Sequence, residues 1–174
     1  MNACCSRARA RRSARGFTLV ELVVVIALIG IVAAIALPRF LDLREEAHQN
    51  SVAATAASLE QAVILANTAC IYEEYQGLDN LPSFGAGDVD FNGNCFPSST
   101  NGNNNLNVNG NRCRQVWSGL LSPAPSISTL ALDDTDYRAQ GGGTVCRYTY
   151  RRDTGVLRRI FYDAATGEVS VTNP

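Results

Sequence analysis

Few side chains in this sequence could carry out acid–base chemistry. Histidine is the usual general acid or base, and the chain has a single one, His48, in a charged stretch. The short motifs of serine hydrolases, zinc proteases and phosphate-binding loops do not occur in the sequence. A lone histidine among charged residues is usually solvated, so we predict that the protein is not an enzyme and uses no cofactor.

One segment has the spacing of the first half of a calcium-binding loop. Asp88, Asp90 and Asn92 occupy its first, third and fifth positions, and Gly93 occupies the sixth. The twelfth position, where a calcium loop has a bidentate glutamate, is Ser99. A turn rich in Asp and Asn is the favoured interpretation, with calcium as the alternative, and no metal site is predicted.

A glutamate interrupts the most apolar part of the chain. Glu21 is the only charged residue between Phe17 and Leu37. Placing a carboxylate in the apolar region of a membrane costs at least ~2.5 kcal/mol, so such a residue usually has a function or a partner. An α-amino group would be a suitable partner, and a buried polar pair could fix the register between helices. The alternative is a side chain that reaches the lipid headgroups.

The apolar run around Glu21 is long enough to cross a membrane. It covers residues 17–37, and at about 1.5 Å per residue such a helix spans roughly the 30 Å of a bilayer core. Five arginines and no acids precede it, which predicts a cytoplasmic N-terminus and export of the rest. They are Arg7, Arg9, Arg11, Arg12 and Arg15.

Two other interpretations of this run fit less well. A cleaved secretory signal has an apolar run of only about 7–15 residues, and the run of residues 17–37 is longer. An ordinary membrane anchor stays open, but it gives no reason for a glutamate within the run.

The residues around Gly16 resemble the type IV prepilin and pseudopilin signature. The segment reads Arg15-Gly16-Phe17-Thr18-Leu19-Val20-Glu21-Leu22-Val23-Val24-Val25. In that family a membrane-embedded aspartyl peptidase cuts after the glycine and methylates the new N-terminal amine. The resemblance implies a cleaved leader, residues 1–16, removed by a prepilin peptidase between Gly16 and Phe17, and N-methylation of Phe17.

The resemblance also implies roles within the apolar run. Glu21 becomes the fifth residue of the mature chain, where the family has a glutamate that meets the N-terminal amine of a neighbouring subunit. Related filaments have a helix that loses regular structure between a glycine and a proline at the positions of Gly30 and Pro38. We expect the segment from Gly30 to Leu37 to extend on assembly, and a simple proline kink is the alternative.

Removal of the leader would leave an acidic chain. All basic residues are arginine, and ten arginines against sixteen acids give a side-chain charge of −6. Nucleic acid is therefore not expected as a partner.

Four cysteines follow the apolar run, and Cys4 and Cys5 lie in the leader. The four are Cys70, Cys95, Cys113 and Cys146. An even number in an exported segment indicates disulfides, with three possible pairings. The absence of a C-x-x-C pair and the single histidine in the sequence argue against zinc.

The exported part is predicted to continue as an amphipathic helix, residues 38–75, ending near Tyr72. Apolar residues recur in it at helical intervals and should face a globular head. They are Val52, Ala56, Leu59, Val63, Ala66 and Cys70. The Asn- and Gly-rich stretch from Gln76 to Asn111 is predicted to be a long surface loop. A short helix over Arg112–Leu121 should bury its tryptophan.

Three segments near the C-terminus have the composition of strands. Thr144–Tyr150, Val156–Tyr162 and Glu168–Thr172 are separated by short turns, which predicts an antiparallel meander. Pro123 and Pro125 come before them in an extended link. The predicted fold is α+β, a long N-terminal helix packed on a small antiparallel sheet, with a head domain over residues 76–174.

The exported part also resembles MSHA-type adhesion pilins in patches. The similar segments are RFLDL after Pro38, CRQVWSGLL, VCRYTY and FYDAATGEVSV, whereas the Asn-rich insert departs from that pattern. Because Cys113 and Cys146 lie in these patches, the resemblance favours pairing them, which leaves Cys70 with Cys95. It also implies a role in adhesion.

Five arginines lie in the first hairpin of the predicted sheet. They are Arg147, Arg151, Arg152, Arg158 and Arg159. The favoured interpretation is a solvated edge that discourages strand pairing and meets acids of neighbouring subunits. DNA or another anionic ligand is the alternative, and adjacent strand residues such as Arg158 and Arg159 should point to opposite faces.

These observations predict a structural subunit of a type IV pilus that polymerises with itself and mediates surface attachment. Its precursor would lie in the bacterial inner membrane, meet the pilus assembly platform, and become part of an extracellular filament. A pseudopilin of a type II secretion system, a minor pilin and a singly anchored binding domain are the alternatives.

Overall fold

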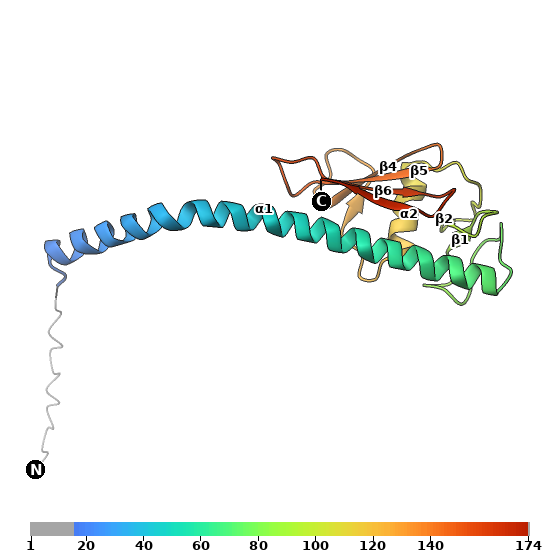
Figure 1. Cartoon of the computed structure of the whole chain (residues 1–174), viewed down its shortest axis with the longest axis horizontal. Helices are drawn as coiled ribbons and strands as arrows, with labels where there is room; N and C mark the ends of the chain where they lie inside the picture. The colour runs from blue at the N-terminus through green and yellow to red at the C-terminus, as the bar shows by residue number, and fades with distance from the viewer. Residues whose placement is uncertain (1–15, 174) are drawn as a thin grey trace, which may run out of the picture. The chain divides into compact units, whose positions relative to one another are not determined.

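The computed structural model describes residues 16–173, and it begins with one long helix. Helix α1 spans Leu19–Tyr72, close to the predicted end (Figure 1). The chain divides within this helix into two compact units, with the boundary between Asp42 and Leu43. The predicted leader, residues 1–16, lies outside the described residues except for Gly16.

The first unit contains the apolar part of α1. The segment Leu19–Leu37 is long and apolar enough to cross a membrane, and none of it is buried within the chain. The stretch from Gly30 to Leu37 is helical in this single chain. Its extension in a filament therefore stays a prediction.

The second unit is a head in which the later part of α1 lies along one side of a sheet (Figure 1). The six apolar residues predicted to face the head are all buried, at no more than 5% exposure. Their intervals of three and four residues place them on one helix face, and that face meets the sheet in a single core.

The sheet has five strands in the order β3-β4-β5-β6-β7. They are β3 (Ile127–Ser128), β4 (Tyr137–Gly142), β5 (Val145–Tyr150), β6 (Arg159–Asp163) and β7 (Val169–Thr172). The predicted antiparallel meander is present in β5, β6 and β7. Together with α1 this confirms the α+β class.

The sheet is larger than the predicted meander, and one of its edges is parallel. Strand β4 adds to the meander, and β3 pairs with β4 in parallel. The sequence of β4, YRAQGG, has one aromatic and no β-branched residue, so its composition gave little strand signal. The link after Pro125 supplies β3.

Helix α2 (Gly110–Leu120) lies against the sheet and matches the predicted short helix. The side chain of Asn109 caps its N-terminus by accepting a hydrogen bond from the backbone N–H of Arg112 at 3.0 Å. Trp117 is fully buried, contacts the rings of Tyr137 and Tyr148, and donates its indole N–H to the carbonyl of Pro125.

The Asn-rich stretch is more ordered than the predicted surface loop. It contains the short antiparallel strands β1 (Asp90–Phe91) and β2 (Pro97–Ser99), and Leu81, Val89 and Val108 are buried in the core. Its fold depends on tertiary contacts, because the sequence between these residues has no apolar period.

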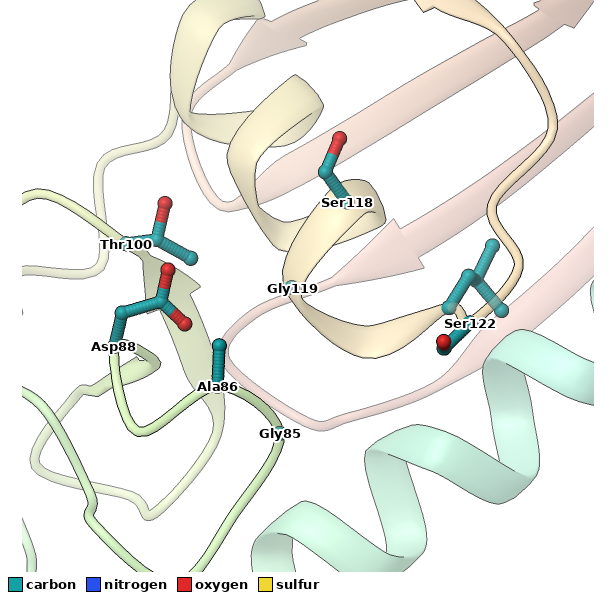
Figure 2. Close-up of a pocket in the computed structure, with 8 residues that line it drawn as sticks. Gly85, Ala86, Asp88, Thr100, Ser118, Gly119 and Ser122 are labelled. Atoms are coloured by element: carbon teal, nitrogen blue, oxygen red, sulfur yellow. The ribbon is translucent and has the colours of Figure 1, made fainter.

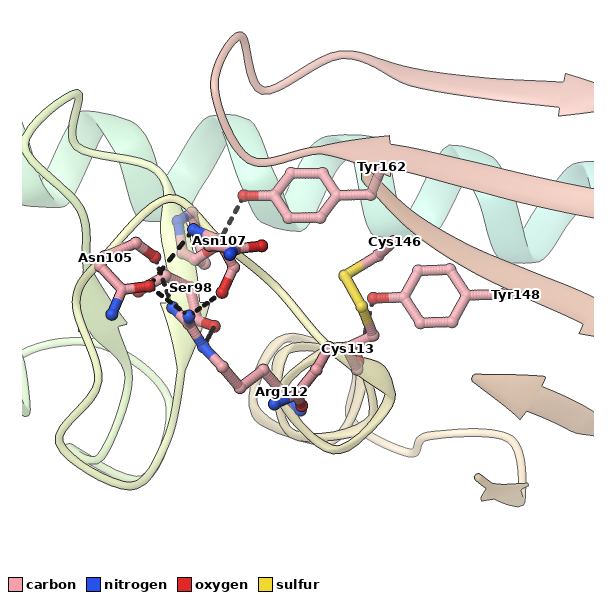
Figure 3. Close-up of a disulfide and its surroundings, with 10 residues drawn as sticks. Ser98, Asn105, Asn107, Arg112, Cys113, Cys146, Tyr148 and Tyr162 are labelled. Carbon is pink, nitrogen blue, oxygen red and sulfur yellow. Dashed lines mark hydrogen bonds between the residues drawn. A yellow bond between two sulfur atoms is a disulfide. The ribbon is translucent and has the colours of Figure 1, made fainter. Parts of the chain in front are cut away.

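Arg112 holds the Asn-rich stretch in place through its side chain (Figure 3). Its guanidinium is buried and donates to the carbonyls of Ser98, Asn103, Asn105 and Asn107, and to the side-chain oxygen of Asn105. Burial lowers the pKa of Arg112 from its ordinary value. The loop therefore wraps around a buried cation held by neutral oxygens.

Two disulfides join segments of the head. Cys70 at the end of α1 is bonded to Cys95, and Cys113 in α2 is bonded to Cys146 in β5 (Figure 3). This is the pairing that the MSHA-type resemblance favoured. The hydroxyl of Tyr148 donates to the carbonyl of Cys113 at 2.9 Å, so the second bridge lies in a hydrogen-bonded part of the core.

Candidate functional site

The first unit presents an apolar helix surface with no cover from the rest of the described chain. Its large apolar side chains from Phe17 to Leu37 are between 44% and 78% exposed. A soluble monomer rarely leaves such a continuous apolar surface uncovered. A surface of this kind suits contact with lipid or with another apolar surface.

A capping box starts this helix. The hydroxyl and the backbone N–H of Thr18 both donate to the Glu21 carboxylate, at 2.9 and 3.0 Å. The backbone N–H of Glu21 donates to the hydroxyl of Thr18 at 3.2 Å. This reciprocal arrangement satisfies backbone donors that a helix N-terminus otherwise leaves free.

Sequence reasoning missed the role of Thr18. The signal was present, because Thr18 and Glu21 form the T-x-x-E spacing of a capping box immediately before an apolar run. Capping is separate from the assembly role predicted for Glu21, which stays a prediction. Its carboxylate is held at the start of the helix, four residues from Phe17, while remaining exposed.

The predicted cleavage site lies just before this box. Gly16, Phe17 and Thr18 precede the first helical residue, and all three are exposed. A peptidase acting between Gly16 and Phe17 would therefore meet an accessible, non-helical backbone. The residues on the leader side of Gly16, including Arg15, lie outside the described part of the chain.

The calcium-loop spacing does not fold as a calcium loop. The Asp90 carboxylate accepts hydrogen bonds from Ser99, Gly102, Asn103 and Asn80. The side-chain oxygen of Asn92 accepts from two backbone N–H groups, those of Asn94 and Phe96.

These oxygens therefore stabilise turns and are not directed at a common centre. No group of three His, Cys, Asp or Glu side chains suitable for a metal occurs among residues 16–173. The turn interpretation is the one that these contacts favour.

Asp88, the first residue of that segment, faces a separate pocket (Figure 2). The pocket has a volume of about 410 Å³ and lies between the loop around Gly85 and the C-terminal end of α2. Thr100, Ser118 and Ser122 are among the residues that line it. One Asp88 carboxylate oxygen is buried without a hydrogen-bond partner among the described residues.

The hairpin arginines are less solvated than predicted. Arg158 is 2% exposed and pairs with Asp153 at 2.9 Å and with Glu45 of α1. Arg152 is partly exposed and pairs with Asp136 of its own chain at 2.7 Å. The predicted solvated edge was therefore wrong for Arg158, because its acids come from the same subunit.

His48 is also only partly exposed. Its Nδ1 atom lies 3.0 Å from the Tyr150 hydroxyl, so His48 has a partner in the sheet besides the solvent expected from the sequence. With the Arg158–Glu45 pair, this contact ties the first turns of the second unit's helix to the sheet.

Comparison with known proteins gives a family motif and a similar pilus protein. The prokaryotic N-terminal methylation motif matches residues 11–37. The type IV narrow pilus major component PilA5 of Thermus thermophilus is 55% identical over 53 residues. That alignment covers 30% of this chain and 46% of PilA5, so the chain spans about half the length of the relative. No solved structure matches the chain significantly.

The exposed apolar helix and the capped glutamate lie within the segment that the methylation motif matches. Part of the chain is also similar to the major component of a type IV pilus. Neither match bears on the finer resemblance to MSHA-type pilins.

Proposed function

We propose that this chain is a structural subunit of a type IV pilus, assembled through its N-terminal helix. The observation that carries the proposal is the capped Glu21 at the start of an uncovered apolar helix. A surface of this kind suits lipid before assembly and other copies of the helix afterwards. The precursor would lie in the inner membrane, and the filament would be extracellular.

Processing creates the partner of this glutamate. We infer that a prepilin peptidase cuts between Gly16 and Phe17 and N-methylates Phe17. The new terminus is an amine, which stays cationic at neutral pH because its reference pKa is near 8. In the filament the amine of one subunit would pair with the Glu21 carboxylate of a neighbour and set their axial register.

The segment between Gly30 and Pro38 would allow the helix to adapt on assembly. Gly30 has open space around its Cα, and glycine lowers helix stability by roughly 1 kcal/mol relative to alanine. Pro38 removes one backbone donor from the helix. Extension of this stretch would need little free energy.

The test is intact mass and N-terminal sequencing of sheared surface filaments from the native host. The expected chain begins with N-methylated Phe17 and contains two disulfides. In a second arm, Glu21→Gln should be processed normally but be absent from filaments. Glu60→Gln removes an exposed acid from the same helix and should assemble as the unaltered chain does.

Each arm has an outcome that would overturn the proposal. A surface protein that keeps residues 1–16 would be a membrane-anchored domain instead. A processed chain confined to the cell envelope would indicate the pseudopilin or minor-pilin alternative, which neither comparison favours. Filaments that incorporate Glu21→Gln at normal levels would remove the role of the glutamate.

A further inference from the structure

The outer face of the sheet carries a cluster of arginines that the filament does not explain. Strand register places Arg138 opposite Thr149, and Thr149 opposite Arg159. Arg147 lies in the adjacent row, between Gln140 and Phe161. Neighbouring residues on each strand are buried against the core, so these side chains share the opposite face.

We refer to Arg138, Arg147, Arg159 and Phe161 as the basic face. All four are half-buried. Within residues 16–173, none of its three arginines forms an ion pair with an acid. The Nε atoms of Arg147 and Arg159 are buried and have no hydrogen-bond partner in that part of the chain.

This cluster is unusual because the rest of the chain is acidic. After Gly16 the sequence has ten arginines against sixteen acids. Arg152 and Arg158 in the same hairpin are paired with acids, whereas the arginines of the basic face are not. A local group of cations without intramolecular acids leaves a positive patch that can attract an external anion.

A depression lies beside these arginines and gives a ligand room to approach. It has a volume of about 210 Å³ and is lined by Gln140, Gly142, Arg147 and Phe161, among others. Gly142 leaves open space where a side chain would otherwise stand. The Arg147 guanidinium donates to the Gln140 side chain at 3.1 Å, which orients its planar group at the rim.

We propose that the basic face binds an acidic glycan. Arginine suits this ligand because its planar fork can donate two parallel hydrogen bonds to one carboxylate. Arg147 and Arg159 would hold carboxylate groups of successive uronic acid residues. One sugar ring would occupy the depression and pack against Phe161. The inference rests on the extracellular filament of the proposed function and goes beyond it by naming a ligand class.

Charge favours a glycan over a nucleic acid on this face. A nucleic acid strand has a phosphate at every nucleotide and would extend beyond three arginines onto an acidic surface, where it is repelled. The volume of the depression suits a single sugar-sized group. Asp163, the nearest acid on the outer face by register, already accepts a hydrogen bond from the Ala165 backbone at 2.9 Å.

The test uses the chain that begins at Phe17, in detergent micelles, and immobilised polygalacturonate, with dextran as the neutral control. Binding should weaken between about 50 and about 200 mM salt because screening reduces the attraction. Replacing both Arg147 and Arg159 by glutamine should weaken it at least about tenfold, as expected for losing charge-assisted hydrogen bonds. Arg114→Gln removes an exposed arginine from α2 and should leave binding within about twofold.

A second variant tests the depression without a change of charge. Gly142→Leu should fill it and weaken binding while the urea unfolding midpoint stays near that of the unaltered protein. Equal binding by the arginine variants, no preference for polygalacturonate over dextran, or tighter binding of single-stranded oligothymidine would overturn the proposal. Because the assay uses unassembled chain, each failure would leave the filament proposal standing.

Discussion

Two arginines are buried in the head, and each collects acceptors from segments far apart in the sequence. Arg112 binds carbonyls of the Asn-rich stretch, whereas Arg158 joins Asp153, Glu45 and the carbonyl of Asn173. Charged groups are seldom buried unless they are satisfied in this way. At the residue scale these side chains set the positions of the loop and the hairpin.

Arg112→Lys should lower the free energy of unfolding by about 2–3 kcal/mol, because one ammonium cannot reach all the carbonyls that the guanidinium fork binds. Urea unfolding would measure this loss, and hydrogen–deuterium exchange over residues 98–107 should become faster. Arg114→Lys, on the exposed side of the same helix, should change stability by less than about 0.5 kcal/mol. Unchanged exchange in the loop would show that Arg112 does not order it.

Arg158→Gln should lower the urea unfolding midpoint, because it removes the cation that pairs with the Asp153 carboxylate beneath the hairpin. Arg152→Gln removes a pair at the surface and should lower the midpoint much less. The two variants can be compared by urea midpoint. Equal losses would contradict the distinction between the buried and exposed pairs.

Acid should weaken the hairpin before the rest of the head. Backbone donation from Gly155, and then Arg158, lowers the pKa of Asp153, and the Ser126 hydroxyl followed by Arg152 lowers the pKa of Asp136. Stabilisation from a lowered carboxyl pKa is present above the ordinary value near 3.9 and is lost as pH falls through the folded-state value.

The unfolding midpoint in urea should therefore fall as pH drops from about 5 to about 2, since both carboxylates become protonated over this range. Asp153→Asn should make that dependence shallower, because one of the two groups no longer titrates. A pH profile identical to that of the unaltered protein would rule out a contribution from Asp153.

At the element scale, the stability of α2 depends on the cap at its N-terminus as well as on its buried face. The cap at Asn109 satisfies the Arg112 N–H, and the same helix carries Cys113 and Trp117 into the core. Its position thus connects the Asn-rich loop, the sheet and a disulfide.

Asn109→Ala should lower stability by about 1 kcal/mol because the N-terminal donor loses its acceptor. Asn109→Asp keeps an acceptor oxygen in place and should retain most of the stability. Thermal or urea unfolding would distinguish them. Equal destabilisation by both substitutions would mean that packing of Asn109, and not capping, matters.

At the scale of the whole molecule, two disulfides close loops in the head. The head has short strands, so these cross-links contribute to its stability. Their sequence separations are 25 and 33 residues. The loop around Cys95 has few apolar residues with which to define its own position. The bridges therefore lower the conformational entropy of the unfolded chain in the segments that receive the least stabilisation from the core.

Replacing Cys70 and Cys95 together by alanine should lower the free energy of unfolding by about 3.5 kcal/mol in the chain-entropy model. The Cys113 and Cys146 pair should cost a similar amount, since loop length enters only logarithmically. Urea unfolding of each double variant provides the comparison. A bridge whose loss leaves the midpoint unchanged would be unnecessary for the fold.

The sequence by itself determined the N-terminal helix, its lone glutamate, the buried stripe of α1, the packed helix around Trp117 and the last three strands. Each of these follows from a local pattern of apolar spacing or turn residues. Strand β4, the order of the Asn-rich loop and the burial of Arg112 and Arg158 were decided only by the tertiary structure. Their partners lie on other elements, and satisfying a buried polar group there overrides the local preference for solvent.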